Sequence, residues 1–586
     1  MCGIAGLVGK PQPGVVERLA DALEHRGPDG QGAYVNGPCA LVHTRLAIID
    51  LEGGDQPFIA QRESGEEVAL VANGEIYNSP ELRVQMPGVA FQSGSDCEPP
   101  LHLYLRHGLD FVDHLRGMYA IAIWDAAHNR LVLSRDPFGI KPLYYAETDQ
   151  GFAFASEPAA LISAGLVKAE LLESQRDALL ELQFTTGRET AFHNIRRVLP
   201  GETIVVENGS IIERHYKEAL PQGGPRRITR SQALHDLDHV LNDSVGVHQR
   251  ADVPYGMFLS GGIDSSVLLA MMSRLNPEPV IAFTAGFSDT SVPDEREHAR
   301  ALAQAEGAAH IEVEFGADDF WSSLPAIAKH LDDPVADYAV LPTWKLAAKA
   351  RAEGIKVVLA GEGGDELFAG YGRYRTATRM LFRKSMYRKG ILENSGVLST
   401  EDLSRLWREP IVKAEIDAME PGRTRLQIAQ ALDIATWLPG DLLTKVDRML
   451  MAHGVEGRVP FLDPRMAEFA FTLPDRYKIK HGQGKHLLRH WLSAAMPGAK
   501  AFSKKRGFTV PVGEWIAARG RKAGDLVARQ DCIGALCDRT RVQELFLSTG
   551  GADAKAAWTL LFYALWHKIH MEETCADGDV FDVLSA

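Results

Sequence analysis

The chain has 586 residues, of which 45% are hydrophobic and 24% are charged, and a chain of this length is expected to divide into two or more domains. Its formal net charge is −14 and it contains no long run of Lys or Arg, which argues against a protein that binds nucleic acid. No apolar run reaches the ~18–20 residues that span a bilayer, and the first residues lack the positive segment of a signal peptide, so we expect a cytoplasmic protein with no membrane partner.

The first 212 residues alternate short apolar strands with turns rich in Gly, Pro and Asn. Helical patterns interrupt the strands at Val15–Glu24 and Pro100–His107. Short strands at this spacing are typical of an antiparallel, layered α+β domain. The strands that the pattern predicts are Gly3–Val8, Ala40–Ile49, Glu67–Ala72, Met118–Trp124, Arg130–Ser134 and Gly151–Ala155.

A stretch rich in Gly, Pro and Arg follows and predicts a linker at 213–230. From Ser231 onward, helical patterns such as Ser265–Arg274 and Glu297–Glu306 alternate with apolar strands. This alternation is typical of a doubly wound α/β domain with a parallel sheet, which we expect to span 231–586 and to be mainly helical from about 375 onward. The predicted strands are Pro254–Leu259, Val280–Thr284, His310–Val313 and Lys356–Ala360.

The six cysteines are sparse and show no CxxC or Cys/His ligand spacing, which argues against a disulfide framework and a zinc site. Cys2 is of interest because removal of the initiator Met would place a thiol and a free α-amine on one residue. With a reference pKa of ~7.7–8.0, that amine can accept the thiol proton directly or through one water. Cys2 is therefore a candidate nucleophile, although a Cys at position 2 alone is weak evidence.

Several short segments offer what a nucleophile acting on a small amino acid would need. The planar guanidinium of Arg45 has paired N–H donors suited to a carboxylate, and Asp96 could hold an ammonium group. Asn73 beside the Gly74 N–H could hold the oxyanion of a tetrahedral intermediate. Each feature also has a plain structural explanation, since Asn-Gly is commonly a turn and an Arg at a strand end commonly lies at the surface.

Together, and in this order behind Cys2, these segments resemble the glutaminase domain of class II, or N-terminal nucleophile, amidotransferases over about the first 200 residues. The resemblance implies a layered αββα fold in which Cys2 attacks the side-chain amide of glutamine, ammonia leaves and water releases glutamate. It implies an oxyanion hole made by Asn73 and the Gly74 N–H. The residues that it implies for glutamine binding are Arg45, Leu46, Ile48, Asn73, Glu75 and Asp96.

A loop suited to phosphate, Ser260–Ser266, lies between a predicted strand and a predicted helix. Its glycines let the backbone curl around an anion, and the helix offers unpaired N–H groups. The loop is neither a Walker A motif nor a GxGxxG fingerprint; it resembles the pyrophosphate-binding loop of the ATP pyrophosphatases, which split ATP between its α- and β-phosphates.

A second Gly-rich loop, Gly361–Phe368, follows another predicted strand. In a doubly wound sheet both loops can face one crevice at the carboxyl ends of the strands. Asp264 and Asp365 are then candidate ligands of Mg2+ beside a triphosphate, or simply carboxylates that stabilise helix N-termini. A basic run, Lys504–Arg506, suggests a local anion site.

The second half, about 235–570, resembles asparagine synthetases in the two Gly-rich loops and in Val446–Arg448, Gly457–Asp463 and Gly484–Arg489. The resemblance implies that Glu362 supports formation of an acyl-adenylate or takes a proton from ammonia, and that Lys485 neutralises transition-state charge. The residues that it implies for ATP are Leu259, Ser260, Gly261, Gly262, Asp264, Ser265, Ser266, Ala285, Ala360 and Gly361.

The implied reaction joins ATP and a carboxylate, by resemblance aspartate, into an acyl-AMP that ammonia from glutamine converts to an amide. An internal tunnel is expected to carry the ammonia, and a homodimer is allowed. The segment Asp333–Pro342, where the family shapes its acceptor pocket, carries Tyr338 and Ala339 in place of a small hydroxyl pair, which leaves another carboxylate open as the acceptor.

Two further alternatives are a β-lactam-forming synthetase and a non-catalytic regulatory relative. The first uses no glutamine, and the intact Cys2, Arg45, Asn73 and Asp96 argue against it. The second is expected to have lost a catalytic group, and the sequence retains each of those that the resemblance implies.

Overall fold

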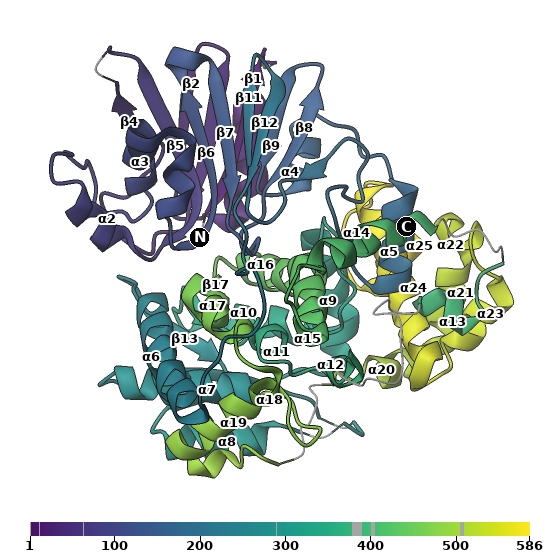
Figure 1. Cartoon of the computed structure of the whole chain (residues 1–586). Coiled ribbons are helices and arrows are strands. Elements are labelled where there is room, and N and C mark those ends of the chain that lie inside the picture. Colours follow the sequence, from purple (N-terminus) through teal and green to yellow (C-terminus); the bar gives the residue numbers. More distant parts are fainter. Residues whose placement is uncertain are drawn as a thin grey trace.

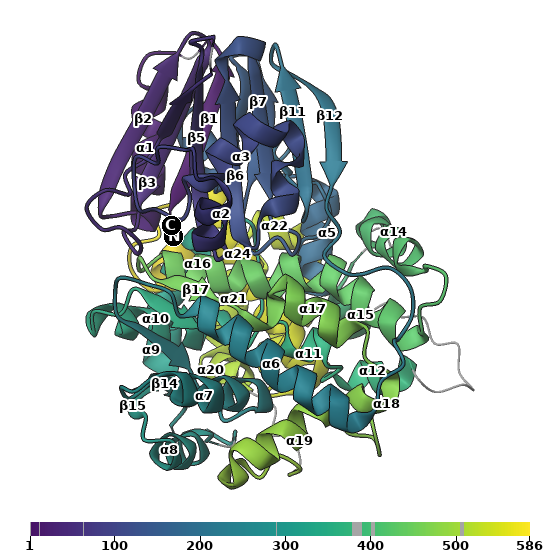
Figure 2. The same ribbon diagram turned by 60° about the vertical axis from the view of Figure 1, so that its left-hand side comes forward.

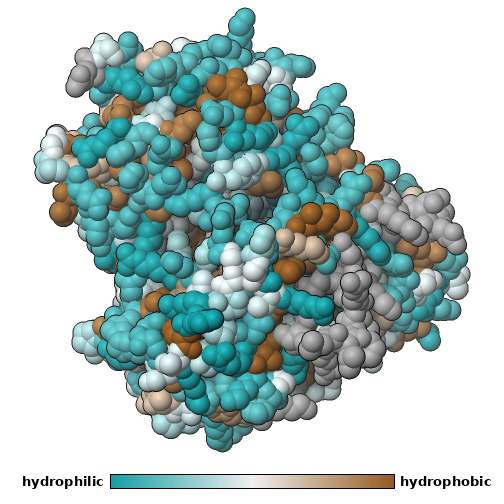
Figure 3. All heavy atoms as spheres, viewed as in Figure 1, coloured by the Kyte–Doolittle hydropathy of each residue, from teal (hydrophilic) through white to brown (hydrophobic). Residues whose placement is uncertain are grey.

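The computed structural model describes residues 2–10, 12–62, 64–288, 290–292, 294–377, 390–399, 405–503 and 509–586. A part rich in β-strands carries the N-terminus and sits on a larger, mostly helical part, with the last helices at one side (Figure 1). The face seen in Figure 3 is mainly hydrophilic, with hydrophobic residues in small separate groups. Within the described ranges, no helix has both the length and the apolar character needed to cross a membrane.

Two six-stranded antiparallel sheets form the first part. In spatial order, the strands of one sheet are β10 (Arg196–Arg197), β8 (Tyr144–Thr148), β9 (Gly151–Ala155), β1 (Gly3–Gly9), β3 (Cys39–Arg45) and β2 (Gly30–Asn36). Those of the other are β12 (Ser210–Tyr216), β11 (Glu202–Glu207), β7 (Arg130–Arg135), β6 (Gly117–Asp125), β5 (Glu67–Ile76) and β4 (Phe58–Gln61).

The αββα layering follows from the period of two along the strands. In β1, Ile4 and Val8 face the second sheet, whereas Ala5 and Leu7 pack against α1 (Val15–Leu23) and α4 (Pro158–Ser163). On the outer face of the second sheet, α2 (Ser79–Gln85) and α3 (Pro99–His107) cover alternate residues of β5 and β6. The predicted layered αββα fold is confirmed, and burial on both faces explains why the strands read as continuous apolar runs.

A parallel sheet forms the centre of the second part. Its spatial order is β15 (Ala309–Glu314), β14 (Ile281–Gly286), β13 (Tyr255–Phe258), β16 (Val357–Leu359) and β17 (Glu456–Arg458). Helices on one side are α6 (Arg230–His248), α7 (Ile263–Leu275) and α8 (Arg296–Ala305), and those on the other are α9 (Ala317–His330) and α10 (Val340–Ala352). The predicted doubly wound sheet is confirmed, with β17 added at its edge.

In the described residues from the second Gly-rich loop onward, α-helices dominate, as predicted. They are α11 (Gly364–Leu367), α12 (Gly372–Ala377), α13 (Ile391–Ser395), α14 (Glu409–Ala418), α15 (Arg425–Ala435), α16 (Thr444–Met451), α17 (Pro464–Phe471), α18 (Asp475–Lys478), α19 (His486–Ala495), α20 (Val512–Ala518), α21 (Gly520–Arg529), α22 (Asp531–Gly534), α23 (Arg539–Leu545), α24 (Gly551–His570) and α25 (Val580–Ser585).

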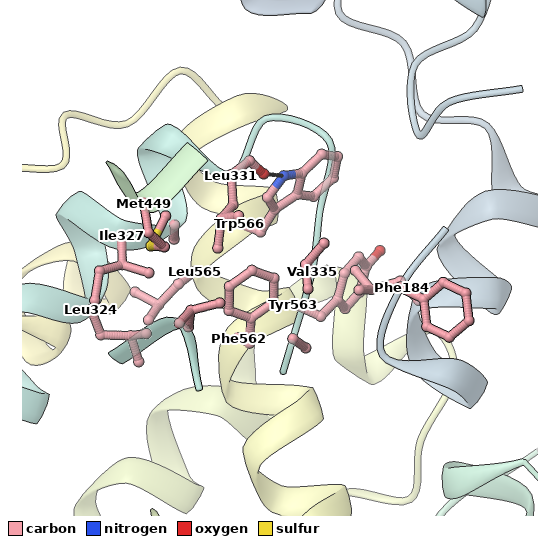
Figure 4. Packing of buried hydrophobic residues seen from close by; sticks show 14 of the residues in the cluster. Phe184, Leu324, Ile327, Leu331, Val335, Met449, Phe562, Tyr563, Leu565 and Trp566 are labelled. Carbon is pink, nitrogen blue, oxygen red and sulfur yellow. Dashed lines mark hydrogen bonds between the residues drawn. The ribbon is translucent and has the colours of Figure 1, made fainter. Parts of the chain in front are cut away.

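The longest of these, α24, is buried along most of its length and lies at the centre of the largest hydrophobic cluster. Trp566 Nε1 donates to the carbonyl of Leu331 at 2.9 Å (Figure 4), and Trp558 Nε1 donates to that of Ala336 at 2.6 Å. These bonds fix the buried chain just before and within the expected acceptor segment, Asp333–Pro342.

The boundary between the two halves is less sharp in the structure than the change of strand pattern along the sequence indicates. Strand β12 ends at Tyr216 and α6 begins at Arg230, but α5 (Glu173–Leu182), from the first half, packs against α24 of the C-terminal part. The division into 1–212, a linker at 213–230 and 231–586 stays a prediction.

Replacing Trp566 with Phe tests the role of α24. Phe has one ring fewer than the indole, so the change leaves a small cavity at a fully buried position and removes the donor to the Leu331 carbonyl. We expect a loss of about 1–3 kcal/mol in the free energy of unfolding. Urea unfolding followed by circular dichroism measures it. Leu547→Ala, at an exposed position, is the control and should change stability by less than about 0.5 kcal/mol; equal losses would contradict the assignment.

Candidate functional site

Cys2 lies immediately before β1 and is 8% exposed. Its backbone N–H donates to Asn73 Oδ1 at 3.1 Å, and its carbonyl accepts from Arg26 Nε at 3.2 Å. Burial raises the pKa of the Cys2 thiol, while the Leu46 N–H and the Arg45 guanidinium oppose that rise. The structure therefore brings Cys2, Arg45, Leu46 and Asn73 together.

Asn73 and Gly74 lie within strand β5 and not in a turn, because the predicted strand Glu67–Ala72 continues to Ile76. With Asn73 Oδ1 engaged by Cys2, the buried Nδ2 has no hydrogen-bond partner among the described residues. Gly74 is required by the close pairing with β6, since a Cβ there would lie 2.2 Å from the Met118 carbonyl. An unpaired amide donor beside the thiol is what an oxyanion hole needs.

The other expected glutamine-binding residues lie around this centre. Arg45 Nη1 donates to Asp55 Oδ1 at 2.8 Å and Nη2 donates to the Asp50 carbonyl at 2.5 Å, so the guanidinium also holds the loop after β3. Leu46 and Ile48 are buried in that loop, which is irregular although the sequence predicted a strand as far as residue 49.

Two buried carboxylates, Asp96 and Glu75, complete the set of expected glutamine-binding residues. Asp96 Oδ2 accepts from the Ile76 N–H at 2.6 Å. Burial raises the pKa of Asp96, although this hydrogen bond acts to lower it. Glu75 Oε1 accepts from Arg458 Nη2 at 2.6 Å. The sequence offered no signal for Arg458 as a member of this site, because it lies 383 residues away along the chain.

The Ser260–Ser266 loop joins β13 to α7, so the expected strand–loop–helix arrangement is present. Gly261 has φ +68°, a left-handed conformation that Gly adopts without steric cost. Ser260 Oγ accepts from the Gly262 N–H at 3.3 Å and lies 3.2 Å from Ser265 Oγ. The loop borders a cavity of about 740 Å³, and Ser266 is buried behind it in α7.

Lys485 lies between the two carboxylates predicted as metal ligands. Its Nζ is paired with the Asp264 carboxylate and lies 2.7 Å from Asp365 Oδ1. Burial works to lower the pKa of Lys485, but the two carboxylates raise it above its usual value. A lysine flanked by two carboxylates therefore lies beside the phosphate-type loop, in a cavity that other charged side chains also line. Lining residues with charged or titratable side chains that the sequence analysis did not assign to this site are Glu295, His298, Arg489 and Lys500.

The donor set fits a Mg2+ ion that arrives with phosphates. Within the described part of the chain no three His, Cys, Asp or Glu side chains form a metal cluster. Mg2+ is commonly held by one or two carboxylates together with substrate phosphates and water, and Asp264 and Asp365 meet that requirement. The basic run 504–506 lies outside the described residues.

Glu362 follows the carboxyl end of β16, directly after Ala360 and Gly361. Burial raises the pKa of Glu362, which Lys445 opposes, and Glu362 Oε2 has no partner in the described ranges. Leu259 and Ala285 lie at the carboxyl ends of β13 and β14, so the expected ATP residues gather at one edge of the sheet.

Lys445, on α16, and Asp337, in the expected acceptor segment, form an ion pair of 2.8 Å near Glu362. Neither was identified from the sequence. An acidic side chain in the segment Asp333–Pro342 was the available signal, but its lysine partner comes from a distant helix.

Thiol labelling tests the buried state of Cys2. The thiolate is the reactive form, and each unit by which a pKa is raised lowers the thiolate fraction at neutral pH about tenfold. We expect iodoacetamide to modify Cys575, which is exposed, well before Cys2. Mass spectrometry of timed samples measures both rates, and faster modification of Cys2 would contradict its burial.

Comparison with known proteins agrees with this geometry. The family model described as asparagine synthase matches residues 236–568, and that of a glutamine amidotransferase domain matches residues 1–217. A putative glutamine-hydrolysing asparagine synthetase of Mycobacterium tuberculosis is 34% identical over 98% of this chain and 96% of its own length. The glutamine-hydrolysing asparagine synthetase 1 of Bacillus subtilis is 30% identical over 98% and 97%.

A more distant relative is the amidase chry2 of Gibberella zeae, which is 28% identical over 83% of this chain and 86% of its own. The asparagine synthase model covers more than half of the chain, and the M. tuberculosis and B. subtilis relatives match nearly all of it. The chain belongs to the asparagine synthase family and carries a glutamine amidotransferase domain at its N-terminal end.

Proposed function

We propose that this protein is a glutamine-dependent asparagine synthetase, which makes ammonia at Cys2 and uses it to amidate aspartate that ATP has activated. The observation that carries the proposal is the presence of two complementary sites in one chain. One places Cys2, whose backbone N–H donates to Asn73 Oδ1, beside the unpaired Asn73 Nδ2 donor. The other places Lys485 between two carboxylates beside the Ser260–Ser266 loop.

In the first half-reaction, the Cys2 thiol attacks the side-chain amide carbon of glutamine and gives its proton to the α-amine freed by removal of Met1. Asn73 Nδ2 and the Gly74 N–H hold the negative oxygen of the tetrahedral intermediate. The carbon–nitrogen bond then breaks, and ammonia leaves with the proton from the amine. Water hydrolyses the remaining thioester to glutamate and restores the thiol. Arg45 holds the glutamine carboxylate, and Asp96 and Glu75 hold its ammonium end.

In the second half-reaction, a carboxylate oxygen of the acceptor bonds to the α-phosphorus of ATP, and pyrophosphate leaves. ATP is the co-substrate that the family implies. A Mg2+ ion held by Asp264 and Asp365 would neutralise phosphate charge. Lys485 stabilises the negative charge that develops on the phosphates. Glu362, whose pKa is raised by burial, is suited to take a proton from ammonia as it displaces AMP.

An acceptor other than aspartate is a second candidate. Tyr338 is half-buried beside the Lys445–Asp337 pair, and burial together with Asp337 raises its pKa. A neutral phenol in this position would narrow or reshape an acceptor pocket. One relative that matches most of both chains is named an amidase and not an asparagine synthetase.

A cytoplasmic location and a homodimer are further parts of the proposal. Aspartate, glutamine and ATP are metabolites of the cytoplasm, which supports the first. Light scattering of the purified protein would measure the second, and a monomer at micromolar concentration would contradict it.

Pyrophosphate release with ATP, Mg2+ and glutamine, in the presence and absence of aspartate, tests the function. We expect release that depends on aspartate, with asparagine identified by mass spectrometry. If glutamine is hydrolysed but aspartate causes no pyrophosphate release, the acceptor is another carboxylate. Absence of both activities would refute the proposal.

A pair of variants tests the separation of the two sites. Cys2→Ala removes the nucleophile, so we expect glutamine-dependent synthesis to fall by a factor of about 1,000 or more, while synthesis from added ammonia continues. Glu362→Gln should do the reverse, losing amide formation from either nitrogen source while glutamine hydrolysis is kept. Loss of both activities in each variant would contradict two separate sites.

A further inference from the structure

Arginine–carboxylate contacts cross the interface between the β-sheet part and the helical part. Arg26 donates to Asp447 Oδ2 at 2.8 Å, and Arg116 donates to Asp243 Oδ2 at 2.6 Å. A third contact joins Arg458, at the end of β17, to Glu75. Both overall views place β17 directly beneath the β-sheet part (Figures 1 and 2).

The Arg458 side chain is fully buried and all three guanidinium nitrogens are engaged. Nη2 donates to Glu75 Oε1 at 2.6 Å and Nε donates to Glu456 Oε1 at 2.5 Å. Nη1 donates to the carbonyls of His248 and Arg250 at 2.9 and 2.6 Å. The planar fork is thus held from several sides, a geometry that Lys cannot reproduce.

The backbone of Arg458 belongs to the other site. Strand β17 pairs with β16, with Arg458 opposite Leu359, and the Arg458 carbonyl accepts from the Ala360 N–H at 2.8 Å. Ala360 and Gly361 lead directly to Glu362. The position of the Arg458 backbone therefore also fixes the start of the Ala360–Glu362 loop.

Glu75 links Arg458 to the thiol site. It lies on β5 two residues after Asn73, whose side chain contacts Cys2. Burial raises the pKa of Glu75, and the Arg458 guanidinium opposes that rise. A shift of Arg458 would therefore change both the position and the charge of a carboxylate in the glutamine site.

The geometry points to Arg458 as a positioning residue shared by the two sites, whose side chain sets Glu75 and whose carbonyl sets the Ala360–Glu362 loop. When bound glutamine holds Glu75 in one position, Glu75 also holds the Arg458 side chain, and the Arg458 carbonyl holds the Ala360–Glu362 loop. Binding of glutamine therefore changes the affinity for ATP, and binding of ATP changes the affinity for glutamine. Such coupling is reciprocal and typically changes affinity by about 5- to 150-fold. This inference rests on the proposed function.

The test measures binding at equilibrium in full-length Cys2→Ala protein, which does not consume glutamine. Calorimetry gives the Kd of ATP with Mg2+ in the presence and absence of saturating glutamine, without an acceptor. With Arg458 intact we expect glutamine to change this Kd by about fivefold or more. With Arg458→Lys added, the change should shrink to less than about twofold.

Arg116→Lys is the matched control. It also weakens a partly buried arginine contact across the interface, to Asp463 at 2.8 Å and to Asp243, but it touches no residue predicted for either site. We expect it to retain the full effect of glutamine on ATP binding. Its midpoint of thermal unfolding, compared with that of Arg458→Lys, shows whether the two replacements loosen the fold to the same extent.

Glu75→Gln provides a second variant if Arg458→Lys does not fold, since it removes the charge that holds the guanidinium. It should also abolish the effect at a glutamine concentration that calorimetry shows to saturate this variant. The inference is overturned if Arg458→Lys keeps the effect, if Arg116→Lys loses it equally, or if the protein with Arg458 intact shows none. Failure of the proposed function is a separate result, namely that the unmodified protein neither hydrolyses glutamine nor releases pyrophosphate.

Discussion

Buried charge at the interface between the two parts is the constraint on which both candidate sites depend. Arg26 and Arg448 share the carboxylate of Glu157, at 2.7 and 3.1 Å, and Arg26 also pairs with Asp447. Each of these side chains is removed from water. Removal of one partner from such a set costs about 3–5 kcal/mol, because the remaining charge stays buried without compensation. The two parts can dock only where every charge meets its partner.

The pairing of buried charges at the interface also affects the two sites, because the paired residues are neighbours of the functional groups. Arg26 holds the carbonyl of Cys2, and Arg448 lies on the same helix as Lys445, three residues away. Since Lys445 pairs with Asp337 near Glu362, helix α16 connects the interface to the expected acceptor pocket. The same contacts therefore dock the two parts and position the residues of both sites.

The order of the parallel sheet places the second site. Strand β13 pairs with β14 on one side and with β16 on the other, so the connections leave it in opposite directions and open a crevice at the carboxyl ends. The Ser260–Ser266 and Gly361–Phe368 loops meet there, and a Cβ on Gly364 would lie 2.6 Å from the Asp264 carboxylate. The close approach of these loops brings Asp264 and Asp365 to Lys485.

Local sequence determined the elements whose signal is periodic or chemical. Buried strands such as β1 and β6, the Ser260–Ser266 loop after β13, and the candidate nucleophile Cys2 could all be identified from neighbouring residues. Strand β17 could not, since three residues carry no period, and Asn73 was read as a possible turn although pairing with β6 keeps it in a strand. The roles given to the site residues stay predictions.

Only the tertiary structure decided which distant charges meet. Arg458 and Glu75 are 383 residues apart, and Lys445 and Asp337 are 108 apart, and nothing in the flanking residues of either member specifies the other. Desolvation supplies the reason, because a buried charge requires a partner of opposite sign in the final packing, wherever that partner lies in the chain. The sequence by itself determined the chemistry available to this protein, and the packing of its two parts decided how those groups are paired.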